Sequence, residues 1–331
     1  MAGRLTDEML EAADCLLAHD VVAGDAHMTE FRRRTRHHHA RWRQKRGFPI
    51  GASSVRPGTP VRPIGSELDL EFAVETGATF LSPRARAAAD HRMATIEPNQ
   101  RVNRRTFWAD LMSSEALAIN LFADLAADHD RATKAVQAWW PGTPGRVREV
   151  RFLHSPGRSD PTFSNSLRSF DACFVLERSD GTRGALAVDV TYREVTERRA
   201  VKPTHMPRFG EIHDRSGVFT SDALAQVNPS RVSMLWLEHV LLLSMLQHVS
   251  GEWSWGRYVV VHPQGNHDIA AASAQYRSLL ADDASFGTST IEDLLTAEVL
   301  PARTASAIRG RYLPRGAARS MTPADPRPPT A

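Results

Sequence analysis

Residues 168–194 contain two runs rich in valine, phenylalanine, leucine and alanine, separated by a short polar segment. Two apolar runs there flank the sequence Ser-Asp-Gly at residues 179–181, which is typical of a tight turn between antiparallel strands. The pattern predicts a β-hairpin with strands over residues 170–177 and 184–193. Side chains alternate between the two faces of a strand, so one face of the second strand would carry Ala187, Asp189, Thr191 and Arg193.

Two aspartates interrupt these apolar strands, Asp171 in the first and Asp189 in the second. A charge in the middle of a strand is costly unless it is paired or binds a metal. A three-residue loop or a bulge would place Asp171 opposite Asp189, whereas a two-residue loop would place it opposite Val190, because a one-residue slip turns side chains to the other face. Two adjacent carboxylates suit a hard cation such as Mg²⁺, which activates water and stabilises a phosphoryl transition state.

Apolar residues spaced three to four positions apart predict helices along much of the remaining chain. Thr6 is expected to cap the first of them. The predicted helices span residues 6–18, 28–46, 67–78, 82–96, 107–128, 230–249, 266–280, 291–300 and 304–312. Further strands are predicted at residues 147–154 and 258–262, and the Pro- and Gly-rich residues 50–66 are predicted to form a loop.

Glu115 lies on the apolar stripe of the predicted helix over residues 107–128. An acid that faces a protein core needs a partner, and either a metal or an arginine would serve. The alternative is a glutamate at the edge of the stripe that reaches solvent. Glu115 is therefore a candidate ligand for a metal held by the two aspartates.

The chain has 331 residues, 42% of them hydrophobic, which is enough for one large domain or two small ones. Its formal net charge is only +3, which is compatible with nucleic-acid binding without requiring it. Of the 41 basic residues only Lys45, Lys134 and Lys202 are lysines. Arginine suits bidentate phosphate contacts, although a GC-rich genome explains the same bias.

Basic residues concentrate in the predicted helix over residues 28–46 and in the polar stretch over residues 194–222. Both stretches are candidates for contact with DNA phosphates, and the alternatives are a solvated basic helix and a plain exposed loop. The candidate DNA-binding residues are Arg32, Arg33, Arg34, Arg158, Arg198, Arg199 and Lys202. The three consecutive histidines at residues 37–39 do not share a helix face and so do not form one metal site.

Other features limit the class of protein. Cys15 and Cys173 are expected to be free thiols, so neither a disulfide framework nor a zinc site is implied. The N-terminus carries acids where a signal peptide needs a basic and then an apolar run, and the apolar residues 235–246 are too few to span a bilayer. We therefore expect a cytoplasmic protein with no membrane partner. Residues 315–331, rich in proline and alanine, are expected to be disordered.

Several stretches together resemble a known family. They are FRRRTRHHHARWRQKRGFPIG at residues 31–51, ETGATFLSPRAR at 75–86, SSEALAINLFADLA at 113–126, VRFLHSPGRSDPTF at 150–163, the hairpin, and LWLEHVLLLSML at 235–246. The chain is similar to a bacterial restriction-endonuclease-like family of the PD-(D/E)XK nuclease superfamily. In this superfamily one strand carries an Asp and the next carries an acid-X-Lys sequence.

The resemblance implies an α/β fold with an αβββαβ core, in which helices flank a mixed central sheet. Residues 101–313 would form this core, residues 1–100 an N-terminal helical extension and loop, and residues 314–331 the disordered tail. The implied cofactor is Mg²⁺ or Mn²⁺, and the implied partner is double-stranded DNA. The metal ligands would be Asp171, Asp189, Glu115 and the backbone carbonyl of Val190. Whether the chain forms a homodimer is left open.

The chain departs from the superfamily pattern at Thr191, which stands where the lysine is expected. That lysine normally orients or polarises the attacking water, and Arg193 does not replace it as a base because arginine keeps its proton. In the long helix, Ser233, Met234 and Leu237 stand where relatives are expected to have glutamines and an arginine. One hypothesis is a Mg²⁺-dependent DNA endonuclease with Thr191 in the active site. A second is a nuclease-fold protein without cleavage that binds DNA or a partner, and a third is an unrelated metal enzyme acting on a small molecule.

Overall fold

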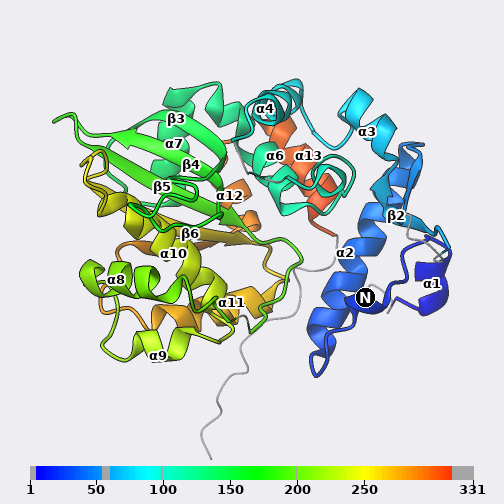
Figure 1. Cartoon of the computed structure of the whole chain (residues 1–331). Coiled ribbons are helices and arrows are strands. Elements are labelled where there is room, and N and C mark those ends of the chain that lie inside the picture. The colour runs from blue at the N-terminus through cyan, green and yellow to red at the C-terminus, as the bar shows by residue number, and fades with distance from the viewer. Residues whose placement is uncertain (1–4, 54–59, 98–99, 101, 199, 315–331) are drawn as a thin grey trace, which may run out of the picture.

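The computed structural model describes residues 5–53, 60–97, 100, 102–198 and 200–314. Its centre is a five-stranded sheet in the order β3-β4-β5-β6-β7 (Figure 1). The strands are β3 (Arg146–His154), β4 (Phe170–Glu177), β5 (Arg183–Val190), β6 (Trp255–His262) and β7 (Phe286–Thr290). The first three strands pair antiparallel and the last three parallel, so the sheet is mixed, as expected.

Helices cover both faces of this sheet (Figure 1). One hydrophobic cluster joins Phe174 and Leu186 to the helices on one face, and a second joins Cys173 and Ala187 to those on the other. The first face is covered by α4 (Pro83–Ala94), α6 (Ser114–Ala126), α7 (His129–Trp139), α12 (Ile291–Thr296) and α13 (Ala302–Tyr312), and the second by α8 (Met206–Ser216), α9 (Ala223–Val227), α10 (Ser233–Leu246) and α11 (His267–Arg277). This is the layered α/β architecture that the sequence predicts.

The hairpin of β4 and β5 has the longer of the two predicted loops. Arg178 donates its backbone N–H to the carbonyl of Thr182 (2.9 Å), so three residues, 179–181, form the turn. Gly181 adopts a positive φ of 82° there, which a glycine tolerates without strain. The register pairs Ala172 with Val188 and, continued by one residue, places Asp171 opposite Asp189. The two-residue loop is thereby excluded.

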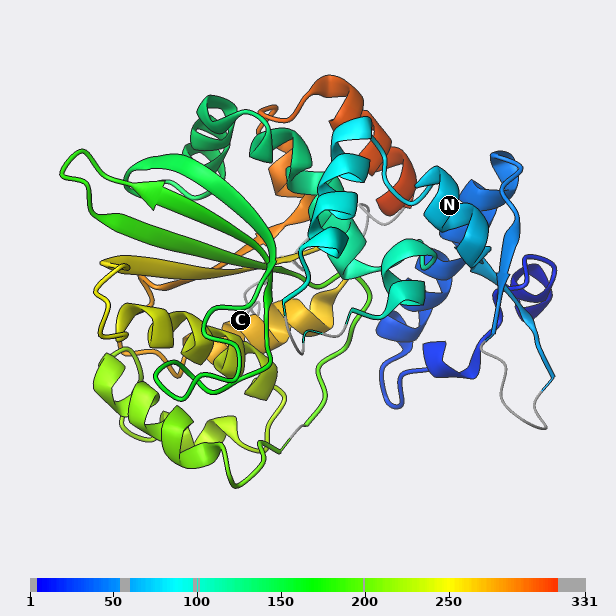
Figure 2. The same ribbon diagram turned by 45° about the horizontal axis from the view of Figure 1, so that its top comes forward.

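The N-terminal elements lie at one end of the molecule and the turn of the β4–β5 hairpin at the other (Figure 2). They are α1 (Asp7–Glu11), the 3-10 helix η1 (Ala18–Asp20), α2 (Ala26–Lys45), β1 (Ile50–Ala52), β2 (Pro63–Leu68) and α3 (Leu70–Thr76). Thr6 caps α1 as predicted, but α1 is shorter than expected. The predicted loop over residues 50–66 instead contains the antiparallel strands β1 and β2.

Other expectations need correction. The predicted helix over residues 107–128 is two helices, α5 (Arg104–Trp108) and α6, because Ser113 starts α6 by accepting a hydrogen bond from the backbone of Ala116 (3.2 Å). The polar stretch over residues 194–222 contains α8 and so is not simply a loop. The strand predicted to reach Arg193 ends at Val190. Helix α7 and strand β7 were not predicted, and residues 315–331 lie outside the described part of the chain.

No helix within the described ranges is both long and apolar enough to cross a membrane.

Candidate active site

Two carboxylates meet where β4 begins and β5 ends. Asp171 Oδ2 accepts a hydrogen bond from the backbone N–H of Val190 (2.8 Å). Asp189 Oδ1 accepts one from the backbone N–H of Asp171 (3.3 Å). Each aspartate therefore binds the backbone of the opposite strand, and both side chains are partly buried. The hairpin register thus holds two acids side by side on one face of the sheet.

The surroundings make ionisation of this pair costly. Burial raises the pKa of Asp171 well above its ordinary value, and the charges of Asp189 and Glu115 raise it further. Burial likewise raises the pKa of Asp189, and the neighbouring Glu238 adds to the shift. The two carboxyl groups therefore hold their protons more tightly than exposed aspartates do, and a bound cation would favour their ionised forms.

Glu115 and Glu238 approach the pair from opposite faces of the sheet, on α6 and α10. The pKa of each is raised, mainly by burial. In each of them the Oε2 atom is buried and has no hydrogen-bond partner in the described part of the chain. Glu238 Oε1 does pair with Arg168, whose positive charge also lowers the pKa of Asp189. Glu238 was not predicted as a site residue, although an acid inside a strongly apolar helix is a signal that could have found it.

A cavity of about 530 Å³ opens beside Asp189. Thr191 lines it, directly after the end of β5, and its backbone N–H donates to the carbonyl of Val261 on β6 (2.8 Å). Tyr258 also lines it, and its hydroxyl donates to Asp189 Oδ2 (3.0 Å). Nothing in the sequence pattern distinguishes Tyr258 from a core residue of β6, so this contact could not be foreseen.

The donor chemistry of this region fits a hard divalent cation. All four acidic side chains offer oxygen ligands, and two of them, Glu115 and Glu238, keep buried oxygens with no partner among the described residues. In the part of the chain that the structure describes, however, no three acidic, histidine or cysteine side chains form a ready-made metal site. Glu115 thus acts on Asp171 through its charge without completing a three-acid site among the described residues. Mg²⁺ commonly binds through one or two carboxylates and keeps several waters, so two carboxylates are as many as it needs from the protein.

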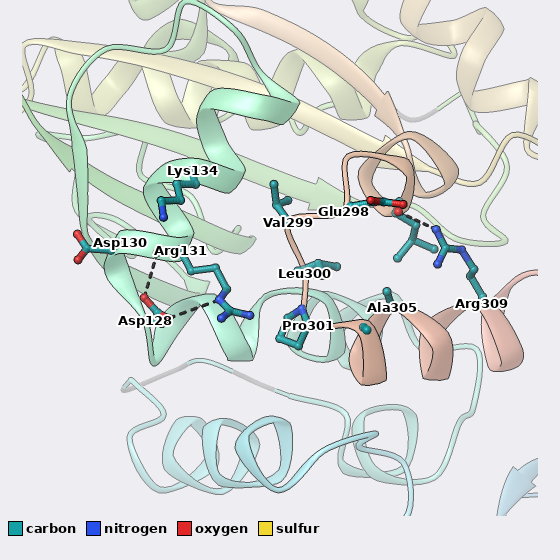
Figure 3. Close-up of a pocket in the computed structure, with 12 residues that line it drawn as sticks. Asp128, Asp130, Arg131, Lys134, Glu298, Val299, Leu300, Pro301, Ala305 and Arg309 are labelled. Carbon is teal, nitrogen blue, oxygen red and sulfur yellow. Dashed lines mark hydrogen bonds and ion pairs between the residues drawn. The ribbon is translucent and has the colours of Figure 1, made fainter.

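No lysine lines the cavity beside Asp189. Lys134 lies instead in a separate cavity of about 930 Å³ between α7, the segment after α12, and α13 (Figure 3). There the acids Asp128, Asp130 and Glu298 accompany the basic side chains, and Arg131 pairs with Asp128 (3.4 Å). Lys45 and Lys202 are exposed elsewhere. The fold therefore does not bring a lysine to the position that Thr191 leaves vacant.

The candidate DNA-binding residues have different surroundings. Arg33 pairs with Asp7, and Arg34 pairs with Glu30 (2.6 Å). Arg158 donates to the carbonyl of Leu167 (2.6 Å) and so stabilises its own loop. Arg198 and Lys202 are exposed, and Arg199 lies outside the described residues.

Arg32 is different because it lines the cavity beside Asp189 and Thr191. Its Nε atom is buried without a partner, and among the described residues it makes no hydrogen bond or ion pair. Glu194 and Asp20 act on it only through their charges. Among the described candidate DNA-binding residues, Arg32 therefore lies at the cavity beside Asp189.

Helix α2 is not a solvated basic helix along its whole length. Arg36 and Arg43 are buried, and Arg43 donates to the carbonyls of Gly65 (2.9 Å) and Phe48 (2.8 Å). His39 is buried as well, and its Nε2 lies 3.0 Å from the hydroxyl of Tyr192. The buried arginines of this helix therefore hold the N-terminal elements to one another, and His39 links them to Tyr192 beyond the end of β5.

A mixed sheet between helices, with two acids opposed across its antiparallel hairpin, defines the architecture of a restriction-endonuclease-like nuclease. A family model described as the PD-(D/E)XK nuclease superfamily matches residues 25–314. The match covers most of the chain, and the protein therefore belongs to this superfamily. Comparisons with curated proteins and with solved structures gave no significant match.

Proposed function

We propose that the protein is a Mg²⁺-dependent DNA endonuclease that hydrolyses phosphodiester bonds, with Thr191 in place of the usual lysine. Membership of the nuclease superfamily supports the reaction class. The observation that carries the proposal is the opposition of Asp171 and Asp189 across the hairpin, where each carboxylate binds the other strand. Mn²⁺ would replace Mg²⁺, because both accept oxygen ligands.

Each residue has a proposed role. Asp171 and Asp189 would hold the ion, which when bound supplies an activated water and stabilises charge on the phosphoryl group. Tyr258 holds Asp189 Oδ2 in place, and the hydroxyl of Thr191 would orient a water at the cavity. Glu115, with its unpaired Oε2, would accept a hydrogen bond from a water near the ion. The Val190 carbonyl remains a proposed fourth ligand.

The test is cleavage of supercoiled plasmid in Mg²⁺ or Mn²⁺ by the wild type, Asp171→Asn and Asp189→Asn. Asparagine keeps the shape of aspartate and removes its charge, so both variants are expected to fold and to lose cleavage. Thermal unfolding supplies a second readout, because an ion that binds only the folded state raises the melting temperature. Mn²⁺ should stabilise the wild type more than either variant. Cleavage that persists in both variants would refute the proposed active site.

A second candidate function is a nuclease-fold protein that binds DNA without cutting it. The observation in its favour is that neither a lysine nor a third acid completes the site. Thr191→Lys distinguishes the two, since it restores the superfamily residue at the edge of the cavity. A wild type that binds but does not cut DNA, together with a Thr191→Lys variant that cuts, would favour the binding protein. Cutting by the wild type, abolished in Asp189→Asn, would favour the endonuclease.

A further inference from the structure

A third cavity, of about 630 Å³, lies between the end of α2 and α13. Four positively charged residues line it: Arg41, Lys45 and Arg46 from the end of α2, and Arg309 from α13, which also lines the cavity that holds Lys134 and three acids. None of the ten residues that line it is an aspartate or a glutamate. We call this cavity the α2–α13 hollow. It is separate from the cavity beside Asp189, with which it shares no lining residue.

The sequence produces this hollow through helical spacing. His38, Arg41 and Lys45 are three and four residues apart, so they lie along one face of α2. On the facing helix, Gly310 provides an open wall, since a Cβ built there meets no atom within 4 Å. A basic helix face opposite a residue without a side chain leaves room for a ligand.

The positive charge in the hollow is not neutralised by the protein. Arg41 donates only to Gln44 of its own helix (2.8 Å), and no described residue forms an ion pair or hydrogen bond with Lys45. Arg309 donates to a backbone carbonyl, that of Leu295 (2.7 Å), and Arg46 lies over the ring of Trp42 (4.3 Å). No acidic side chain of the described chain pairs with any of the four.

The helix dipoles offset only part of this positive charge. Both α2 and α13 end at the hollow, and the C-terminus of a helix is equivalent to about half a negative charge. Two helix ends therefore offset about one of the four positive charges. The remainder is available to an anionic ligand.

We propose that the α2–α13 hollow binds phosphates of the DNA backbone outside the reaction centre. The choice of DNA rests on the proposed function. Helix α2 connects the two sites, because it carries Arg32 in the cavity beside Asp189 and Arg41 in the hollow. The nine helical steps from Arg32 to Arg41 rise by about 14 Å and turn Arg41 to the other side of α2, so this rise is the least separation of the two sites. One DNA strand has a phosphate about every 3.4 Å along its axis, so the hollow meets the backbone at least about four base pairs from the reaction centre.

The surroundings of Trp42 favour backbone contact over base stacking. Arg46 lies over its ring at 4.3 Å, and the buried Arg311 lies 5.0 Å from its centroid. Bases stack on aromatic rings that are exposed, and this ring is flanked by two guanidinium groups. The hollow therefore offers charge, and no stacking platform, to a nucleic acid.

The experiment measures binding of a fluorescent duplex of about 20 base pairs, long enough to reach both sites, in EDTA so that no cleavage occurs. The variant is Arg41→Ala with Lys45→Ala, and the one hydrogen bond that it loses among the described residues is that to Gln44. Each phosphate contact contributes about 0.9 to the slope of log affinity against log salt. We expect the slope to fall by about 2 and affinity to fall at least tenfold. The matched control, Arg104→Ala with Arg303→Ala, removes the same charge from two exposed positions outside the hollow and should change little.

A second pair of variants leaves the existing side chains intact. Gly310→Glu places an acid in the open wall, and Gly310→Gln is its uncharged match of the same size. We expect Gly310→Glu to weaken duplex binding and Gly310→Gln to bind like the wild type, because only charge differs.

Several outcomes would overturn the inference. They are unchanged binding by the Arg41/Lys45 variant, an equal loss in the Arg104/Arg303 control, and equal behaviour of the two Gly310 variants. ATP binding that is lost in the Arg41/Lys45 variant, together with a DNA affinity that does not depend on these residues, would assign the hollow to a free nucleotide instead. Because binding is measured without metal, a wild type that fails to cut DNA would refute the proposed nuclease activity. The duplex-binding comparison of the variants would still test the α2–α13 hollow.

Discussion

The ion pair of Arg36 with Asp20 offers the sharpest test of how the N-terminal elements are held. Arg36 Nε donates to Asp20 Oδ2 at 2.6 Å, and Nη2 donates to Oδ1 at 3.0 Å. The two side chains are only 3% and 2% exposed. Arg36 Nη1 also reaches Ser66 on β2 (3.2 Å). This cluster therefore joins α2 to η1 and to the N-terminal hairpin.

We predict that Arg36→Met destabilises the protein by about 3–5 kcal/mol, because it leaves the buried carboxylate of Asp20 unpaired. The two bonds to Asp20 alone lead to a similar figure, because a hydrogen bond to a charged group contributes about 1.5–3 kcal/mol; the bonds of Arg36 to Ser66 and His19 are lost as well. Methionine preserves most of the side-chain volume, so loss of packing contributes little. The assay is equilibrium unfolding in urea, followed by the free energy extrapolated to water.

Arg34→Met is the matched control, since Arg34 pairs with Glu30 on the same helix but at the surface. A surface pair of this kind contributes about 0.3–0.5 kcal/mol. Adding Asp20→Leu to Arg36→Met should recover much of the loss, because no unpaired charge then remains buried. A loss in Arg36→Met no greater than that of the control would refute the role given to this ion pair.

Three further predictions concern the candidate site. In EDTA, the stability of Asp189→Asn relative to the wild type should grow as the pH rises above 3.8, the ordinary pKa of aspartate, and urea unfolding at several pH values measures this. Burial and Glu238 raise the pKa of Asp189 in the folded wild type, which therefore binds the proton more tightly than the unfolded chain and loses stability as the proton leaves. Arg32→Ala should weaken DNA binding and lower the salt slope by about 1, whereas Arg34→Ala should not; equal effects in a binding titration would contradict the role of Arg32. Tyr258→Phe removes the hydroxyl that lowers the pKa of Asp189, so the acidic limb of the cleavage profile should move to higher pH; an unchanged limb would show that Asp189 does not control it.

The hairpin and the most apolar helix could be predicted because their signals are local. Alternation across β4 and β5, with a glycine turn between them, leaves little choice of structure, and it placed Asp171 and Asp189 on neighbouring strands. Strand β7 has no such signal, since its sequence is Phe-Gly-Thr-Ser-Thr. It is a strand because β6 offers an unpaired parallel edge, a tertiary cause that no local pattern contains.

The break between α5 and α6 shows a different limit. Leu111 and Met112 continue the apolar spacing and are fully buried, so periodicity alone predicts one helix. Asp110 instead accepts a hydrogen bond from the backbone of Met112 (2.9 Å) and forms an isolated bridge with Glu67. The break depends on partners brought from a distant part of the chain.

The site was predictable in its acids but not in their neighbours. Glu238 and Tyr258 come from elements that pack onto Asp189 only after the sheet has formed. The arginines of α2 look alike in sequence, yet Arg36 is buried against Asp20, Arg34 pairs at the surface, and Arg32 faces the cavity. Charge is visible in a sequence, whereas its partners are set by tertiary packing.

The three-residue turn at 179–181 has a consequence for how this gene can change. Arg178 lies seven positions after Asp171, a distance of about 23 Å along the strand. Yet the length of the turn decides whether Asp189 faces Asp171, because a one-residue slip rotates every later side chain to the opposite face. Substitutions at this exposed tip should be widely tolerated, whereas a single-codon insertion or deletion there should eliminate the acid pair. Insertion and deletion scanning should therefore show that activity requires a turn of three residues, although the turn lies far from the acid pair.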